Sequence, residues 1–254
     1  MLSSPEGRLR FFRRADDRPP QRFRRGVYLI PGLFTMGNMW CGYACIVNAM
    51  RGDYETAAPF IGFAYLLDAL DGRIARLTGA ESEFGLQLDS LADVVSFGIA
   101  PAVLAYAWGL SSLGRLGWAV GFLFVACAAM RLARFNIQSA GGGDKRYFVG
   151  IPSPAAAGVV AATVFFYPSG LDDYRAALPA IAVVLIPAVM MVSTIRYRSF
   201  KDLDLRSRRS FRVLILISVG IVAIWTHPRG VLLALSYAYL ASGLIGYAIS
   251  RFRR

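Results

Sequence analysis

The sequence predicts an all-α, polytopic integral membrane protein with about eight transmembrane helices and both termini in the cytoplasm. Three observations support this fold class. Hydrophobic residues make up 56% of the 254 residues and charged residues 17%, whereas soluble domains average about 45–50% and about 25%. The apolar residues fall into blocks of roughly twenty, the length of a bilayer-spanning helix. Basic residues gather in every second connection between these blocks.

Each apolar block is a predicted helix that ends at a charged stretch. In order, the blocks lie near residues 30–50, 56–76, 86–108, 115–134, 152–169, 175–195, 211–227 and 230–250. The first, third, fifth and seventh connections carry one basic residue each: Arg51, Arg115, Arg175 and Arg229. This sparse set marks one side of the membrane.

All other basic residues fall on the opposite side. The N-terminal arm before residue 27 carries eight arginines, and the remaining ones follow the second, fourth, sixth and eighth blocks. Because cytoplasmic loops are enriched in Lys and Arg, both termini are predicted to be cytoplasmic. A miscounted span would destroy the alternation, so the same pattern supports the number of helices.

The chain divides into a basic cytoplasmic arm, residues 1–26, and a single transmembrane domain, residues 27–254. The arm is too basic and too long before its first apolar stretch to resemble a cleaved secretory signal. Apolar side chains interleave with its arginines, namely Leu9, Phe11, Phe12 and Phe23. The arm is therefore either an interfacial helix on anionic lipid or a solvated basic tail.

The charge and the cysteines exclude two other classes. The net charge of +12 comes from residues at the ends of apolar blocks, so no nucleic-acid partner is expected. Cys41, Cys45 and Cys127 lie inside apolar runs and are too few for a disulfide framework. We interpret them as small packing residues.

Four carboxylates lie in or at the edges of the second and third blocks: Asp68, Asp71, Asp89 and Asp93. A charged carboxylate at the centre of a bilayer costs about 2.5 kcal/mol or more, so these must face a polar cavity. Spacings of three and four residues put each pair on one helix face. Neighbouring antiparallel helices then point four mutually repelling carboxylates at one another. Because oxygen ligands suit Mg²⁺ or Mn²⁺, the sequence predicts a site for two divalent metal ions.

The residues around the carboxylates predict a diphosphate pocket. Gly72 and Ala75 lie on the side of Asp68 and Asp71, and Gly85 lies one turn before Asp89, so a bulky ligand has space to approach the backbone. Arg76 follows at the cytoplasmic end, where its fork of donors matches phosphate oxygens.

The complete pattern Asp68-x2-Asp71-Gly72-x2-Ala75-Arg76-x8-Gly85-x3-Asp89-x3-Asp93 resembles the signature of the CDP-alcohol phosphotransferases. The resemblance implies that the four aspartates bind the metal ions and that Asp89 and Asp93 are catalytic. Asp93 would be either a metal ligand or the base that takes the acceptor proton. It also implies that the CDP group is bound by Asp68, Gly72, Ala75, Arg76 and Gly85.

Three further segments, residues 91–102, 131–136 and 147–154, are similar to the bacterial and archaeal phosphatidylserine synthases of this family. This similarity runs from about residue 28 to 160. It implies that CDP-diacylglycerol is the donor, that the hydroxyl of L-serine is the acceptor and that CMP is released. It also implies a homodimer. The charge pattern predicts that the active site faces the cytoplasm, and the arginine-rich composition suits a bacterial inner membrane, with membrane lipids as surroundings.

Serine carries a carboxylate, so its pocket should contain a further cation. Arg131 and Arg134 are the candidates because their spacing puts them on one face of the fourth helix, on the side of Arg76. Asn136 and Lys145 are weaker choices. The alternative is that these residues are anchors that extend to the headgroups.

One position departs from the family pattern. The family often has Pro-Asn at the start of its first span, where this chain has Pro31-Gly32. Thr35 or Asn38 could supply the polar contact to the cytidine that the family's asparagine would make.

Two alternatives to serine transfer stay open from the sequence. The same chemistry could use glycerol 3-phosphate or inositol phosphate as acceptor, since the basic residues near the pocket suit a phosphate. A divalent-cation transporter would also place carboxylates in the membrane, but it does not account for the Gly, Ala and Arg positions.

Overall fold

The computed structural model describes residues 29–78, 82–140, 147–194, 196–198 and 210–252. The predicted N-terminal arm therefore lies outside the described residues. The helices and strands follow in the order α1 Leu29–Met50, α2 Tyr54–Thr78, α3 Glu83–Asp93, η1 Val94–Ile99, α4 Ala100–Trp108, η2 Leu110–Leu113, α5 Arg115–Ala140, β1 Tyr147–Val149, α6 Ser153–Phe166, α7 Tyr174–Val192, β2 Arg196–Arg198, α8 Ser210–Thr226 and α9 Pro228–Phe252.

Every predicted apolar block is helical in the structure, with two local differences. The third block is a continuous helical run that passes through a π-helical segment, η1, between α3 and α4. The expected all-α class also omitted a short antiparallel pair, β1 with β2, in which Phe148 lies opposite Tyr197. These strands belong to connections, where apolar periodicity carries no information.

Four helical segments of the described chain are long and apolar enough to cross a membrane: 83–108, 115–138, 174–192 and 228–246. Other predicted blocks do not meet this criterion of length and composition. The second half of α2 carries four charged residues, Asp68, Asp71, Arg73 and Arg76, and α6 is short, with 14 residues. The chain is thus a helical membrane protein, and the complete set of spans stays a prediction.

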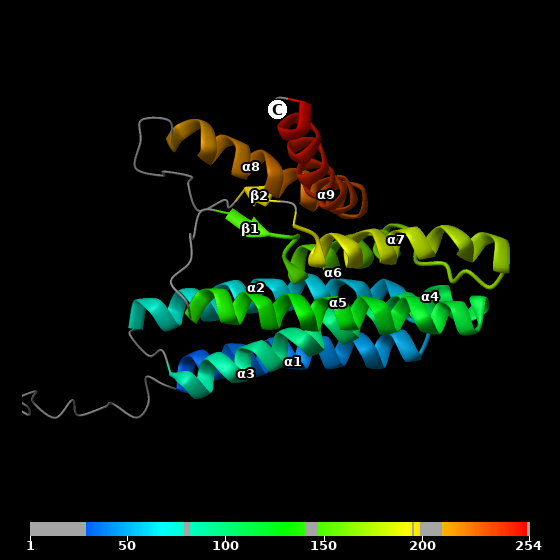
Figure 1. The fold of residues 1–254 in the computed structure, drawn as a ribbon, viewed down its shortest axis with the longest axis horizontal. Helices are drawn as coiled ribbons and strands as arrows, with labels where there is room; N and C mark the ends of the chain where they lie inside the picture. The colour runs from blue at the N-terminus through cyan, green and yellow to red at the C-terminus, as the bar shows by residue number, and fades with distance from the viewer. Residues whose placement is uncertain (1–28, 79–81, 141–146, 195, 199–209, 253–254) are drawn as a thin grey trace, which may run out of the picture.

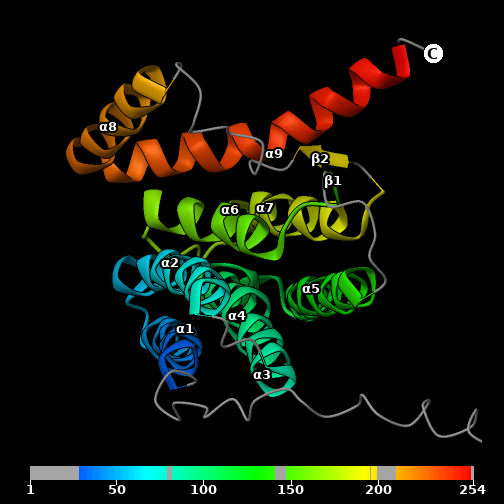
Figure 2. The same cartoon turned by 90° about the vertical axis from the view of Figure 1, so that its left-hand side faces the viewer.

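Helices α1 to α7 lie side by side, and successive helices run in opposite directions, with α3, η1 and α4 forming one continuous run (Figure 1). The run from α3 to α4 packs against both α1 and α5, while α2 packs against α1 and α6. Helices α8 and α9 form an outer layer over α6 and α7 (Figure 2). The alternation places the second halves of α2 and α5 at the same end as the first halves of α1 and α3.

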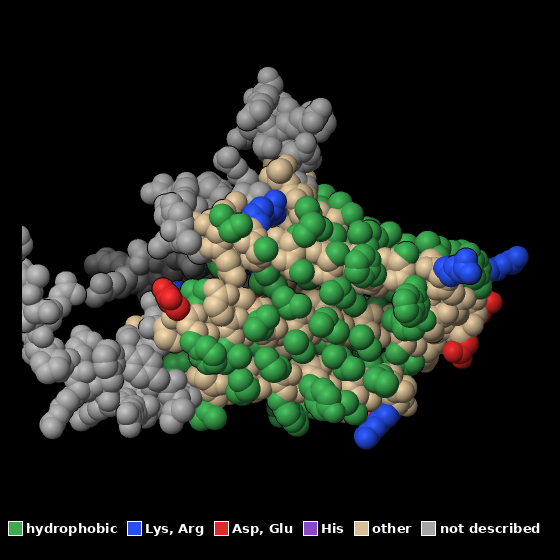
Figure 3. Space-filling view, turned by 60° about the horizontal axis from the view of Figure 1, so that its bottom comes forward, with side chains coloured by type: hydrophobic (Ala, Val, Ile, Leu, Met, Phe, Trp, Pro, Cys, Tyr) green, Lys and Arg blue, Asp and Glu red, His purple; other side chains and the backbone are tan. Residues whose placement is uncertain are grey.

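The surface of the bundle is apolar between its ends. On the face shown in Figure 3, hydrophobic and uncharged side chains cover the central part, and charged side chains lie toward the ends. Cys41, Cys45 and Cys127 are buried in the hydrophobic core, which agrees with their interpretation as packing residues. Exposed apolar side chains such as Leu33, Trp40 and Phe122 suit a lipid environment.

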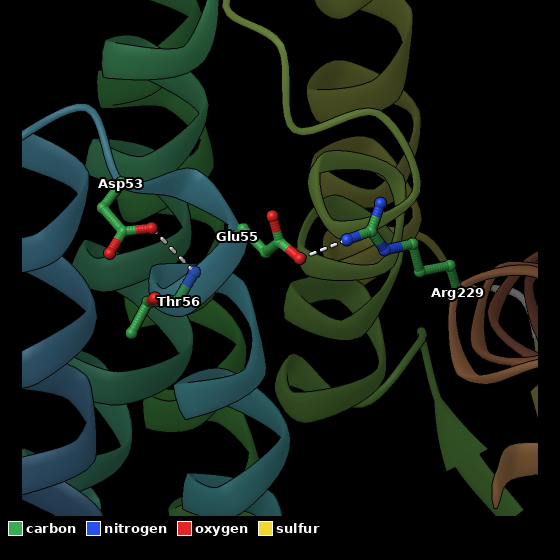
Figure 4. A network of polar contacts seen from close by, with 4 residues as sticks. All are labelled: Asp53, Glu55, Thr56 and Arg229. Carbon is green, nitrogen blue, oxygen red and sulfur yellow. Dashed lines mark hydrogen bonds and ion pairs between the residues drawn. The ribbon is translucent and has the colours of Figure 1, made fainter.

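Helix α9 is attached to the bundle by contacts in its first half. At its start, Arg229 forms an ion pair with Glu55 of α2 (Figure 4), and its guanidinium lies 5.5 Å from the ring centroid of Phe165 in α6. Farther along, the hydroxyls of Tyr237 and Thr163 lie 3.0 Å apart. Because the ion pair is exposed, it contributes at most about 1 kcal/mol, and packing on α6 supplies the main attachment.

Helix α1 and the π-helical segment approach each other at Gly42. A Cβ built on Gly42 would lie 2.9 Å from the Cα of Ser96, closer than atoms can pack. At the same crossing, Ser96 donates a hydrogen bond of 2.9 Å from Oγ to the backbone carbonyl of Asn38. Gly42 therefore sets how deeply α1 sits against η1.

We expect Gly42→Ala to lower the free energy of unfolding by about 1–3 kcal/mol, the usual cost of overpacking. The check is the thermal unfolding temperature of the purified protein in detergent. Gly62→Ala is the matched control, because a Cβ there meets no atom within 4 Å. Both changes add the same helix propensity, so equal unfolding temperatures for the two variants would contradict a close helix contact at Gly42.

Candidate functional site

Three carboxylates converge between the second half of α2, which carries Asp68, and the second half of α3, which carries Asp89 and Asp93. Oxygen atoms of Asp68, Asp89 and Asp93 all lie within 4.8 Å of one another, and each side chain is half-buried. Within the described part of the chain, no basic nitrogen lies within 4.0 Å of these carboxylates. Three anions this close repel strongly unless a cation lies among them. An all-oxygen donor set of this kind fits a hard divalent metal ion.

Asp71, the fourth predicted carboxylate, lies beside this group but is more deeply buried, with 5% of its surface exposed. It accepts a hydrogen bond from the hydroxyl of Thr35 in α1. Asp71 is therefore held by α1, while the other three carboxylates face one another.

A second contact joins α1 to the cluster. Asn38 donates a hydrogen bond of 3.3 Å from Nδ2 to Oδ1 of Asp93. Thr35 and Asn38 are three residues apart and so share a face of α1. Both residues donate to carboxylates in the structure, and a contact from either of them to the cytidine stays a prediction. The available signal was a pair of polar side chains, three residues apart, in the first half of a largely apolar helix.

The predicted small residues differ in what surrounds them. A Cβ on Gly72 would meet no atom within 4 Å, so protein packing does not require glycine there and the space beside the backbone is open. Arg76, one turn later, is exposed and bonds from Nε to the carbonyl of Gly72, at 2.7 Å. Ala75, between them in sequence, is half-buried.

At Gly85, unlike Gly72, the local structure favours a residue without a side chain. Ser82 caps the start of α3, and its Oγ accepts a hydrogen bond of 3.0 Å from the backbone nitrogen of Gly85. A Cβ on Gly85 would lie 3.0 Å from the same oxygen. The small residue therefore keeps the capping serine in place one turn before Asp89.

Arg131 is the predicted serine-binding residue that faces the carboxylates. Its side chain is 9% exposed, and its guanidinium interacts electrostatically with Asp93 and Asp68. Nη1 donates a hydrogen bond of 3.2 Å to Oγ of Ser153 at the start of α6. The guanidinium carbon also lies 5.4 Å from the ring centroid of Phe135. These contacts fix a buried positive charge next to the acidic cluster.

The other predicted serine-binding residues have different surroundings. Arg134 donates hydrogen bonds to the carbonyls of Met191 and Val192, at 3.2 and 3.3 Å, where α7 ends. Asn136 donates from Nδ2 to Oγ of Ser90 in α3, at 2.9 Å. Lys145 lies outside the described residues. Arg134 and Asn136 thus connect α5 to α7 and α3.

The connection before α6 passes close to Arg134 and to the end of α7 at Gly150. Gly150 has a backbone φ of +85°, and a Cβ there would lie 2.3 Å from the carbonyl oxygen of Met191. A side chain is therefore excluded on both counts. This glycine lets the chain pass close to the end of α7 and then enter α6 at Ser153, the partner of Arg131.

Comparison with known proteins gives a consistent result. The family model described as CDP-alcohol phosphatidyltransferase matches residues 28–195. A CDP-diacylglycerol–serine O-phosphatidyltransferase of Helicobacter pylori is 37% identical over 225 residues, which cover 86% of this chain and 91% of that protein.

Two shorter matches point the same way. The protein of the same name from Bacillus subtilis is 34% identical, over 68% of this chain and 91% of its own length. An archaetidylserine synthase of Methanothermobacter thermautotrophicus is 36% identical, over 66% of this chain and 69% of its own.

Proposed function

Because the chain belongs to the CDP-alcohol phosphatidyltransferase family, we propose that it transfers the phosphatidyl group of CDP-diacylglycerol to the hydroxyl of L-serine. The serine oxygen forms a bond to the phosphorus that bears diacylglycerol, and the bond from that phosphorus to the CMP oxygen breaks. The products are phosphatidylserine, CMP and the proton of the serine hydroxyl. The serine acceptor is supported by relatives named for serine transfer.

The observation that carries this proposal is the convergence of Asp68, Asp89 and Asp93 without a basic partner in contact, among the described residues. We assign these three and Asp71 to two divalent metal ions, Mg²⁺ or Mn²⁺. Such ions, when bound, supply charge neutralisation for the diphosphate and for the departing CMP.

The side chains have separate roles in this scheme. Asp89 and Asp93 are the proposed catalytic pair, with Asp93 taking the proton of the serine hydroxyl or contributing as a ligand. The CDP group lies along α2 and the start of α3, against Asp68, Gly72, Ala75, Arg76 and Gly85. The open space at Gly72 admits the diphosphate, and Arg76 binds its oxygens.

We assign the serine carboxylate to Arg131. This guanidinium is buried, held by Ser153 and adjacent to Asp93, so a serine bound to it would place its hydroxyl near the proposed base. Arg134 and Asn136 support this subsite by holding α5 against α7 and α3. Lys145 is assigned to the same proposed subsite from its position in the sequence alone.

The membrane topology is proposed from the charge pattern. Eight spans with both termini in the cytoplasm place the ends of α2 and α5 on the basic side, together with the aspartates. The active site would then face the cytoplasm in the inner membrane of a bacterium, among membrane lipids. Residues 27–254 would form one catalytic domain preceded by the basic arm, and the protein would act as a homodimer.

The experiment that tests the function is CMP release by the purified protein with CDP-diacylglycerol and Mg²⁺ or Mn²⁺. Serine, glycerol 3-phosphate, inositol phosphate and no acceptor are compared. We expect release that depends on serine, with phosphatidylserine as the lipid product. Release with a phosphorylated acceptor alone would overturn the serine assignment, and no release with any acceptor would overturn the reaction.

A further inference from the structure

Asn38 lies at the contact of α1 with the acidic cluster and is completely buried, with 0% of its surface exposed. Its amide nitrogen donates to Oδ1 of Asp93 at 3.3 Å. Its amide oxygen, Oδ1, has no hydrogen-bond partner within the described residues. The backbone carbonyl of the same residue is satisfied by Ser96, so the unpaired group is the side-chain oxygen alone.

A buried acceptor without a partner lowers stability, and an apolar side chain of similar shape would avoid this cost. The leucine side chain branches at the same atom as asparagine and has no polar group, so it would leave no unpaired acceptor. The fold therefore does not need an amide at position 38 for packing. What the amide supplies is its N–H group, aimed at one oxygen of Asp93.

The same face of α1 holds a second carboxylate in an analogous way, because Thr35 donates to Asp71. One member of each aspartate pair is thus held by a donor from α1. Asp93 differs from Asp71 in that it also belongs to the converging group of three carboxylates. A donor on Oδ1 of Asp93 restricts the rotation of this carboxylate beside Asp68 and Asp89.

We propose that Asn38 is a positioning residue for the transfer reaction, which holds Asp93 in its working orientation at the expense of folding stability. This inference rests on the proposed function of Asp93. Asn38 contacts neither the acceptor nor the nucleotide in this scheme. It acts through Asp93, so its loss should lower the rate of turnover more than the affinity for either substrate.

The test is Asn38→Leu, compared with the unaltered protein in two measurements. The first is CMP release at varied serine and CDP-diacylglycerol concentrations, where we expect kcat to fall by about tenfold or more with both KM values nearly unchanged. The second is the thermal unfolding temperature in detergent with EDTA, which checks that the variant is folded under the assay conditions, because Asn38→Leu also leaves Asp93 without its donor. A purely structural asparagine would leave kcat of the folded variant unchanged.

Asn48→Leu is the matched control on the same helix. Asn48 is half-buried, and its amide bonds to the carbonyl of Ala44 at 2.8 Å, without contact to the acidic cluster. We expect kcat to be unchanged in this variant. If Asn38→Leu unfolds, Asn38→Ala is measured in the same way, since it removes the same donor without adding volume. Unchanged kcat in a folded Asn38 variant would overturn the inference. If the unaltered protein released no CMP in response to serine, the proposed function would be overturned instead.

Discussion

Asp93→Asn is expected to lower turnover by about 10²–10⁴-fold, the usual contribution of a positioned acid or base, while the protein stays folded. Asparagine has the shape of aspartate, and its amide oxygen can still accept the hydrogen bond from Asn38. The amide has no negative charge, so it neither takes the serine proton nor binds a cation strongly. Removing one of three mutually repelling carboxylates also relieves strain, so the unfolding temperature without metal should not fall.

The measurements are CMP release, thermal unfolding with EDTA and binding of CDP-diacylglycerol to the variant. Asp173→Asn is the matched control, because Asp173 is an exposed carboxylate at the start of α7 whose side chain makes no capping hydrogen bond. That variant should turn over at the normal rate. Normal turnover in Asp93→Asn would remove Asp93 from the catalytic group and leave Asp68 and Asp89 as the candidates.

The acidic cluster was predictable because helical geometry translates sequence spacing directly into position. Residues three or four apart share a helix face, and a short connection makes α2 antiparallel to the run from α3 to α4, which contacts α2 through η1 and α4. The convergence of Asp68, Asp89 and Asp93 follows from these two facts. The deeper burial of Asp71 does not follow from these facts. It depends on Thr35 in α1, and contacts between separate helices cannot be read from local spacing.

The positions of the apolar blocks were predictable for a similar reason, since the bilayer sets both the length and the composition of a span. The π-helical segment η1 was not. Its extra residue per turn follows directly after Asp93, and the neighbouring contact between Gly42 and Ser96 depends on the fit of α1 against it. Such segments occur often at functional sites, and here the segment begins directly after Asp93 and contributes Phe97 to the hydrophobic core.

The predicted serine-binding residues illustrate where charge patterns stop being informative. Arg131 and Arg134 are three residues apart and equally basic, so the sequence treats them alike. In the structure Arg131 interacts with the carboxylates, and Arg134 donates to the end of α7. The distinction comes from α6 and α7, which supply Ser153 to one arginine and backbone carbonyls to the other. An anchor that extends to the headgroups would be exposed, whereas Arg131 is 9% exposed.

Arg131→Met is therefore expected to raise the KM for serine by about 10- to 100-fold. A hydrogen bond to a charged group contributes about 1.5–3 kcal/mol, and each 1.4 kcal/mol is about tenfold in affinity. Methionine keeps much of the apolar volume beside Phe135. The KM for CDP-diacylglycerol should change little, because Arg76 and the metal site bind the diphosphate in the proposed scheme.

The two KM values separate this role from an indirect effect on the cluster. Arg131 also attracts Asp93 and Asp68, so its loss could disturb the carboxylates, but such a disturbance would lower kcat and affect both substrates. Arg229→Met is the matched control, since Arg229 pairs with Glu55 at the opposite end of α2 from Asp68 and Asp71. A normal serine KM in a folded Arg131→Met variant would show that this buried cation balances the aspartates without binding the acceptor, and the serine carboxylate would then require a different cation.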